Sequence, residues 1–169
     1  MLLSVSLSVA FTFVSSELLD GVGYVAALIV LLFFITVGIL FDMLGVAVTS
    51  ASETPFHSMA SHRERGAAEA IKLLKNAEKV ASICNDVVGD ICGIVSGTTA
   101  AVIVVSLAAQ LRNGNTMALQ LLMTGLVAAL TIGGKAAGKA FAISGSTKIV
   151  LAAGKCIACV KRIFHPRNR

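Results

Sequence analysis

Four ionisable side chains interrupt stretches of the sequence that are otherwise almost wholly apolar: Asp42, Asp86, Asp90 and Lys135. A charged group at the centre of a membrane helix costs about 2.5–3.5 kcal/mol on insertion scales, and such groups mark ion pathways, proton relays or internal ion pairs. Carboxylate oxygens are also the ligands that hard cations prefer. These four side chains are therefore the first candidates for chemistry, and the elements that carry them decide where they act.

The stretches around these residues have the length and composition of membrane helices. Apolar residues make up 56% of the chain, charged residues only 14%, and the mean hydropathy is +0.88, whereas roughly a quarter of a soluble domain is charged. About 20 apolar residues cross a bilayer as a helix, and residues 22–50, 83–111 and 116–142 qualify. Residues 1–20 predict a shorter N-terminal span, with an interfacial or re-entrant helix as the alternative. We expect an all-α membrane protein with three core transmembrane helices.

The basic residues are placed unevenly along the chain. Lysine and arginine gather in residues 51–82 and 146–169. This predicts that both segments are cytoplasmic and that both termini lie on the cytoplasmic side of the cell membrane. Within them, residues 66–83 and 146–165 have the pattern of basic amphipathic juxtamembrane helices. Such helices either contact anionic lipid headgroups or simply anchor the chain on its positive side, and the pattern leaves both readings open.

Several classes of function are not supported by the composition. Basic residues interleaved with aromatic residues, which single-stranded nucleic acid requires, are absent, so no nucleic-acid partner is expected. Cys156 and Cys159 form a Cys-x-x-Cys without a second pair at metal spacing, and they read as small apolar residues. The sequence shows neither a nucleophile–base arrangement nor a phosphate-binding glycine loop. An enzyme is therefore not predicted.

The two aspartates of the second span share a helix face with a ladder of glycines. On a helix that advances about 100° per residue, Asp86 and Asp90 fall within the same stripe as Gly89, Gly93 and Gly97. Glycines at this spacing let membrane helices approach closely. We predict that these three glycines are helix-packing residues and that the protein is a homodimer through glycine-lined faces.

The acidic side chains outnumber the basic ones at this depth of the predicted spans. An acidic excess in a dry cleft must be protonated, hydrated or neutralised by a bound cation. We predict a site for a hard cation, and the residues alone leave the identity of the ion open. Its candidate ligands are Asp42, Ser50, Asn85, Asp86 and Asp90. Lys135 would be an internal countercharge or gate. The alternative is an aspartate–Lys135 pair that only satisfies itself and fixes the packing.

Three segments resemble signatures of the CNNM/CorC family of membrane magnesium transporters. Ser50–Pro55 lie over a Ser-Gly-x-Glu-Thr-Ala signature, and Cys84–Asp90 lie near a Gly-Asn-x-x-x-Asn pattern. Gly134–Ala140 lie over a Gly-Glu-x-x-Pro-Lys-Ala signature. The resemblance covers roughly residues 24–165 in the right order and spacing. It implies three core spans with a juxtamembrane helix, a dimer, and a cation site in an inward-facing cavity, to which Ser50 would contribute. The resemblance makes Mg²⁺ the first choice of ion, with another cation such as Na⁺ left open.

The sequence also departs from the family pattern. Lys135 stands where the family has an acidic ligand, Val46 where it has a serine, and Gly138 where it has the signature proline. The regulatory domains that normally follow are not present in these residues. We therefore predict a short N-terminal span (1–20), a CNNM/CorC-like transmembrane domain (22–165) and a basic tail (166–169). Its function would be a membrane cation transporter or cation-binding protein, or alternatively a non-transporting scaffold whose site is plugged by Lys135.

Overall fold

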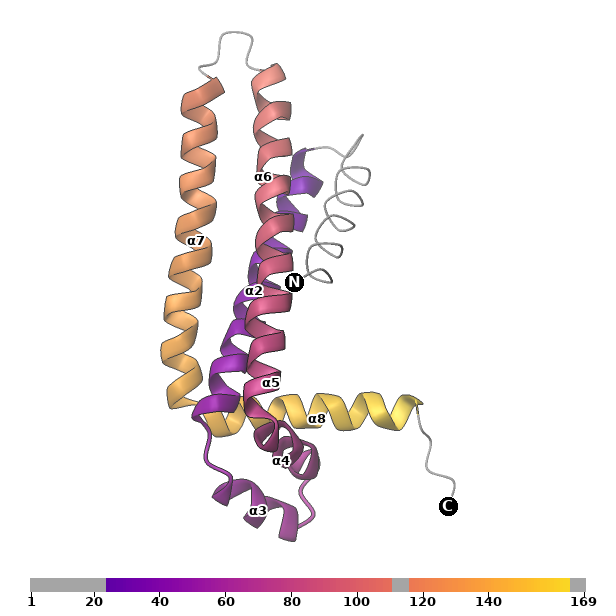
Figure 1. Cartoon of the computed structure of the whole chain (residues 1–169). Coiled ribbons are helices and arrows are strands. Elements are labelled where there is room, and N and C mark those ends of the chain that lie inside the picture. The colour runs from indigo at the N-terminus through magenta and orange to yellow at the C-terminus, as the bar shows by residue number, and fades with distance from the viewer. Residues whose placement is uncertain (1–23, 111–115, 165–169) are drawn as a thin grey trace. The chain divides into compact units, whose positions relative to one another are not determined.

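A computed structural model describes residues 24–110 and 116–164 of the chain (Figure 1). Every regular element in these residues is a helix, which confirms the predicted all-α membrane protein. In chain order they are α2 (Tyr24–Ser50), α3 (Thr54–Ser61), α4 (Ala67–Lys75), α5 (Ala77–Ser82), the π-helix η1 (Ile83–Val88), α6 (Gly89–Gln110), α7 (Thr116–Ser144) and α8 (Ser146–Phe164). The short span predicted for residues 1–20 and the basic tail 166–169 lie outside the described residues.

Three segments of the described chain are long and apolar enough to cross a membrane. They are Val25–Ser50, Ala77–Val105 and Gln120–Ser144, and they correspond to the three spans expected from the sequence. The second one begins at Ala77, earlier than predicted, because α5, η1 and α6 follow one another without a loop. The chain divides into two compact units. In the described residues, the first unit comprises 24–40, 87–110 and 116–136, and the second comprises 41–86 and 137–164.

The first unit is held together by apolar side chains from three helices. Its buried cluster takes one stripe of α2, with a residue every fourth position, two residues of α6 and one of α7: Ala27, Leu31, Ile35, Ala100, Ile103 and Val127. Thr99 is fully buried in α6, and its hydroxyl donates to the carbonyl oxygen of Val95 at 2.7 Å. A hydroxyl that bonds back to its own helix needs no partner from outside, which suits a helix surrounded by lipid.

Small residues set the closest approaches inside the first unit. A Cβ added to Gly38 on α2 would lie 3.1 Å from the Cβ of Cys92 on α6, and one added to Gly134 on α7 would collide with the Ile39 side chain. Gly93 and Gly97 have no such neighbour within 4 Å. Among residues 24–110 and 116–164, Gly93 and Gly97 thus have no close packing partner, and their packing role stays a prediction for contact with a second copy.

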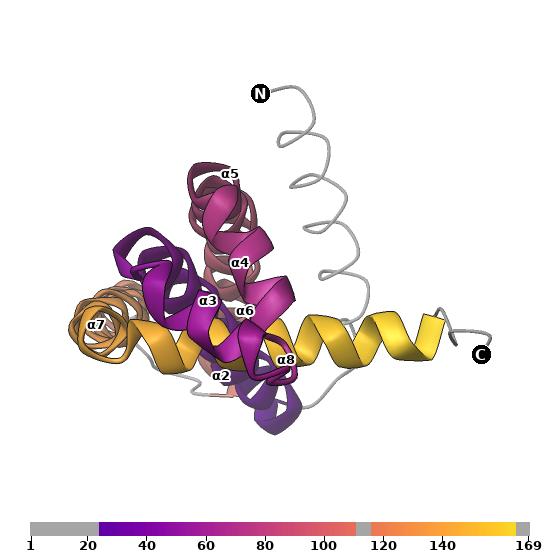
Figure 2. The same cartoon turned by 90° about the horizontal axis from the view of Figure 1, so that it is seen from below.

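The second unit is built on contacts between α3, α4, α8 and the ends of α2 and α7. Its buried cluster has Phe56 of α3 at its centre, with no exposed surface, among Ala47, Val48, Ala70, Leu74, Ala142 and Val150. In Figure 1, α3 and α4 lie on one side of α8, and in Figure 2, seen from that side, they cross in front of it. Pro55 stands in the first turn of α3, where a missing N–H costs nothing.

The backbones of α4 and α8 touch at two glycines. Gly66, which precedes α4, has a φ of 84°, a conformation that favours glycine. A Cβ there would lie 2.5 Å from the backbone nitrogen of Lys155, and a Cβ on Gly154 would collide with the carbonyl oxygen of Gly66. Two ion pairs flank the contact, Lys155 with Glu64 at 3.4 Å and Lys161 with Glu69 at 3.5 Å. This contact fixes which face of α8 is covered.

The juxtamembrane helix expected over residues 66–83 is divided in the structure. It is interrupted at Asn76, whose side-chain amide donates to the carbonyl oxygen of Lys72 at 3.0 Å. The chain then winds as a π-helix from Ile83 to Val88 before α6 begins. Short π-helical turns inside longer helices are rare and often stand at functional sites.

Candidate functional site

Asp42 is the buried carboxylate of the second unit. It lies on α2 with 6% of its surface exposed, and the Nζ of Lys139 on α7 lies 3.9 Å from its Oδ2. A carboxylate taken out of water requires opposite charge or donors around it. Lys139 itself keeps 54% of its side chain exposed, so the pair joins a fixed anion to a cation that has room to move.

Asn85 belongs to the π-helix η1, and its side chain lies against α2 at Gly45. A Cβ on Gly45 would collide with the Oδ1 of Asn85 and would lie 3.1 Å from its Nδ2. The missing side chain at position 45 therefore makes room for the carboxamide. Gly45 follows Asp42 by three residues, about 4.5 Å along the helix axis and on the same side of it. The amide and the buried carboxylate are thus brought to one side of α2.

The Oδ1 of Asn85 is buried and accepts no hydrogen bond from any described residue. Leaving a buried acceptor without a donor costs about 1–3 kcal/mol, and such atoms are uncommon in folded proteins. The chemistry of this atom, a neutral oxygen with two free lone pairs, is that of a ligand for a hard cation or of an acceptor for a bound water.

The other predicted ligands have different surroundings. Asp86 is exposed and accepts a hydrogen bond from the Ser82 hydroxyl at 2.8 Å, and Ser50 is exposed at the last residue of α2. Asp90 is exposed and Lys135 is partly buried, and both belong to the first unit. No three His, Cys, Asp or Glu side chains in residues 24–110 and 116–164 are grouped so that they could hold a metal ion.

Because residues 83–88 form a π-helix, the angular positions calculated for an α-helix do not apply to this segment. The prediction that Asp86 and Asp90 share a stripe with Gly89 assumes a step of about 100° per residue. Residues 83–88 instead have π-helical i→i+5 bonds, so the residues before and after η1 do not keep that phase. Asn85 and Asp86 are presented by this wider winding, whereas Asp90 is presented by the regular helix α6.

Two residues of the site were not among those predicted from the sequence. The Nζ of Lys139 lies 3.9 Å from Asp42, and Gly45 is the residue that admits Asn85. The signal for Lys139 was its position one helical turn after Lys135. The signal for Gly45 was its place three residues after a buried acid, although a glycine in a membrane helix by itself suggests only close packing.

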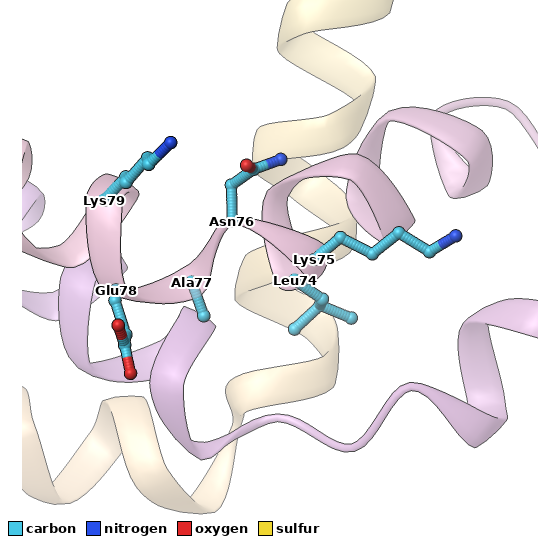
Figure 3. Close-up of a pocket in the computed structure, with 6 residues that line it drawn as sticks. All are labelled: Leu74, Lys75, Asn76, Ala77, Glu78 and Lys79. Carbon is cyan, nitrogen blue, oxygen red and sulfur yellow. The ribbon is translucent and has the colours of Figure 1, made fainter.

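A pocket of about 460 Å³ opens at the break between α4 and α5 (Figure 3). It is lined by the six consecutive residues Leu74, Lys75, Asn76, Ala77, Glu78 and Lys79. In Figure 3 Glu78 and Lys79 point in opposite directions, and the Lys75 side chain extends away from both of them. None of the predicted ligands lines this pocket, and its charges do not converge on a common point.

Most of the chain matches a known family of membrane domains. Residues 28–168 match the cyclin M transmembrane N-terminal domain, termed CNNM. Searches of curated proteins and of solved structures gave no significant match. The match covers most of the chain and includes Asp42, Asn85 and Lys139. The chain therefore belongs to the CNNM family of membrane proteins, whose transmembrane N-terminal domain it carries.

Proposed function

We propose that this protein binds Mg²⁺ in its second unit and moves or senses it across the membrane. Membership of the CNNM family assigns the chain to a class of membrane cation transport proteins. The proposal goes further in naming the ion and the residues: Asp42 and Asn85 hold the ion, with Ser50, Asp86 and Asp90 as further candidate ligands. Na⁺ is the competing ion, because the same oxygen atoms would also bind it.

The observation that supports this function is the buried, unbonded Oδ1 of Asn85, held over Gly45 on the side of α2 that carries Asp42. Mg²⁺ sheds its water reluctantly, and proteins usually bind it through one or two carboxylates while it keeps several waters. One buried carboxylate with a neutral amide oxygen therefore suits a partly hydrated Mg²⁺. A site of this kind needs no cluster of three acids.

Lys139 can balance the negative charge of Asp42 when no cation is bound. Its ammonium lies 3.9 Å from Asp42 and the rest of its side chain is half exposed. A divalent cation that reaches Asp42 would repel this ammonium, and the long side chain can move toward solvent. Lys139 would thus act as a countercharge of Asp42 until the ion binds, and Lys135 stays the countercharge or gate predicted from the sequence.

We place the protein as a multi-pass homodimer in the cell membrane, with residues 51–82 and the C-terminal segment from residue 146 in the cytoplasm. The excess of lysine and arginine in these two segments supports the orientation. The exposed Gly93 and Gly97 support a second copy as the neighbour of α6. Cross-linking of single cysteines placed at these two positions tests the dimer.

The decisive experiment measures how Mg²⁺ changes the thermal stability of the purified full chain. A ligand that binds only the folded state stabilises it by about 1.4 kcal/mol at ten times its Kd. We expect stabilisation in the wild type and in the controls Asn76→Ala and Glu78→Gln, whose side chains are exposed. We expect at least a tenfold weaker response in Asn85→Ala and in Asp42→Asn.

Transport is then tested with the chain in liposomes that contain a Mg²⁺-sensitive dye. Influx that depends on Asp42 and Asn85 supports movement of the ion, and binding without flux supports a sensor. Equal responses of Asn85→Ala and Asn76→Ala would show that the carboxamide of Asn85 is not a ligand and would remove the basis of the proposal.

A second function, a non-transporting scaffold or accessory subunit, is favoured by one observation. The Lys139 ammonium already lies beside the buried carboxylate, so it can replace the cation permanently. In that case the wild type shows no response to any cation, and Lys139→Gln creates one. If wild type and Lys139→Gln both respond, the scaffold is excluded, and the ratio of their affinities measures how strongly the ammonium competes.

A further inference from the structure

Helix α8 carries an apolar strip that nothing in the described chain covers. Its members recur at helical spacing along one side of the helix: Ala152, Cys156, Cys159, Val160 and Ile163. All five are exposed, Val160 by 52% and Ile163 by 72%. We call this set the α8 strip.

The α8 strip points away from α4. Gly154 marks the covered side, because its Cα lies against the backbone of Gly66 and Ala70. Ile163 follows Gly154 by nine residues and is therefore about 180° away around the helix. Since two glycines and two ion pairs fix the α4 contact, the strip is held on the opposite side and cannot turn inward.

The charges of α8 are of one sign. The helix contains Lys148, Lys155, Lys161 and Arg162 and no acidic residue. Lys155 and Lys161 form ion pairs with Glu64 and Glu69. Among the described residues, no ion pair engages Lys148 or Arg162, and both are exposed. Their positions, fourteen residues apart, bring them to the same edge of the α8 strip.

The placement of α8 in the second unit sets what can reach the strip. The helix starts two residues after the end of the candidate span Gln120–Ser144. In Figure 1 it runs crosswise to the last turns of α7, and α4 lies on the side of α8 opposite to the one from which α7 arrives. The α8 strip thus faces the side of α8 from which the last turns of α7, residues 137–144, arrive.

We propose that α8 is a membrane-surface helix that binds anionic lipid, with the α8 strip in the boundary of the acyl chains and Lys148 and Arg162 at the headgroup phosphates. An apolar face with basic residues at its edge is the pattern of helices that lie in the interface, and anionic leaflets attract such charge. This inference does not depend on the proposed cation site.

The first test measures whether lipid contacts the α8 strip, using a fluorophore whose emission is quenched by brominated lipid. The full chain in nanodiscs is labelled at Cys159 in a Cys156→Ser variant, since Cys84 and Cys92 are buried. The matched control is Lys72→Cys, exposed on α4, in a Cys156→Ser/Cys159→Ser background. We expect at least threefold stronger quenching at Cys159. Equal quenching at the two positions overturns the proposal.

The second test asks whether the lipid must be anionic. Thermal stability is compared between nanodiscs of phosphatidylglycerol and of phosphatidylcholine. We expect phosphatidylglycerol to stabilise the wild type, Lys148→Gln/Arg162→Gln to lose most of this preference, and Lys72→Gln/Lys75→Gln to keep it. Equal loss in both pairs would mean that α8 is not the lipid site. Efficient disulfide formation between Cys159 residues of two copies, with no quenching, would assign the strip to a second chain instead.

Discussion

The two units of this protein are stabilised in different ways. In the first unit, apolar side chains of α2, α6 and α7 pack together, and much of the outer surface of these helices is exposed. In the second unit, backbone touches backbone at Gly66 and Gly154, and a fully buried phenylalanine fills the centre. Membrane helices gain little from burying apolar surface, because lipid is equally apolar. The second unit can use the hydrophobic effect wherever water reaches it.

The largest expected effect is the loss of the Phe56 side chain. We expect Phe56→Ala to lower the free energy of unfolding by about 3–5 kcal/mol, because it removes a buried ring and leaves a cavity. Leu31→Ala, in the core of the first unit, should cost only roughly 1–2 kcal/mol, since the cavity remains but the transfer from water is missing. Chemical unfolding in mild detergent measures both. Equal losses would refute the contrast between the units.

The next effect concerns the contact between two backbones. Gly154→Val should destabilise the protein by about 3 kcal/mol, because the new side chain meets the Gly66 carbonyl and the Ala70 backbone, which cannot move aside. Gly125→Val, on α7 with no atom within 4 Å, should change stability by less than about 0.5 kcal/mol. Thermal unfolding of the two variants compares the units directly. A neutral Gly154→Val would mean that α8 does not rest on α4.

Gly45→Ala separates stability from function inside the second unit. The added methyl group displaces the flexible Asn85 carboxamide, while the helix gains up to about 1 kcal/mol from replacing glycine. We therefore expect nearly unchanged thermal stability and at least a tenfold weaker response to Mg²⁺. If the Mg²⁺ response persists, the position of Asn85 over Gly45 has no bearing on the ion.

The smallest effect is expected at the ion pairs beside the α4–α8 contact. Lys155 and Glu64 are both about half exposed, and an exposed pair contributes about 0.2–1 kcal/mol, less at high salt. Lys155→Gln should thus be nearly neutral, and the small difference should vanish as ionic strength rises. If Lys155→Gln destabilises the protein as much as Gly154→Val, the ion pairs and not the glycines stabilise this contact.

The membrane helices were accessible from the sequence because their signal is long. Residues 22–50 and 116–142 were predicted, and the structure has Tyr24–Ser50 and Thr116–Ser144. The amphipathic pattern from residue 146 likewise predicted α8. The π-helix and the break at Asn76 were not predicted, because hydrogen-bond register within a helix depends on what packs against it. No pattern of residue types in the sequence indicates a change of hydrogen-bond register within a helix.

The candidate site was predicted in part for a related reason. Asp42 and Asn85 stand out as polar residues in apolar runs, so the sequence alone indicates them. Gly45 and Lys139 acquire their roles only from side chains that arrive from another helix. Rotation about one helix axis can group residues of that helix, but it cannot show that Lys139 of α7 lies beside Asp42 of α2.

The contact between α4 and α8 also constrains the order in which the protein can be completed. Lys155 and Glu64, at its edge, are 91 residues apart in the sequence, which corresponds to roughly 5–20 s of synthesis at typical ribosomal speeds. During that interval the face of α4 that will receive α8 has no neighbour of its own. The nascent chain therefore exposes this face until α8 has been synthesised, and a chaperone or a lipid surface can bind there in the meantime.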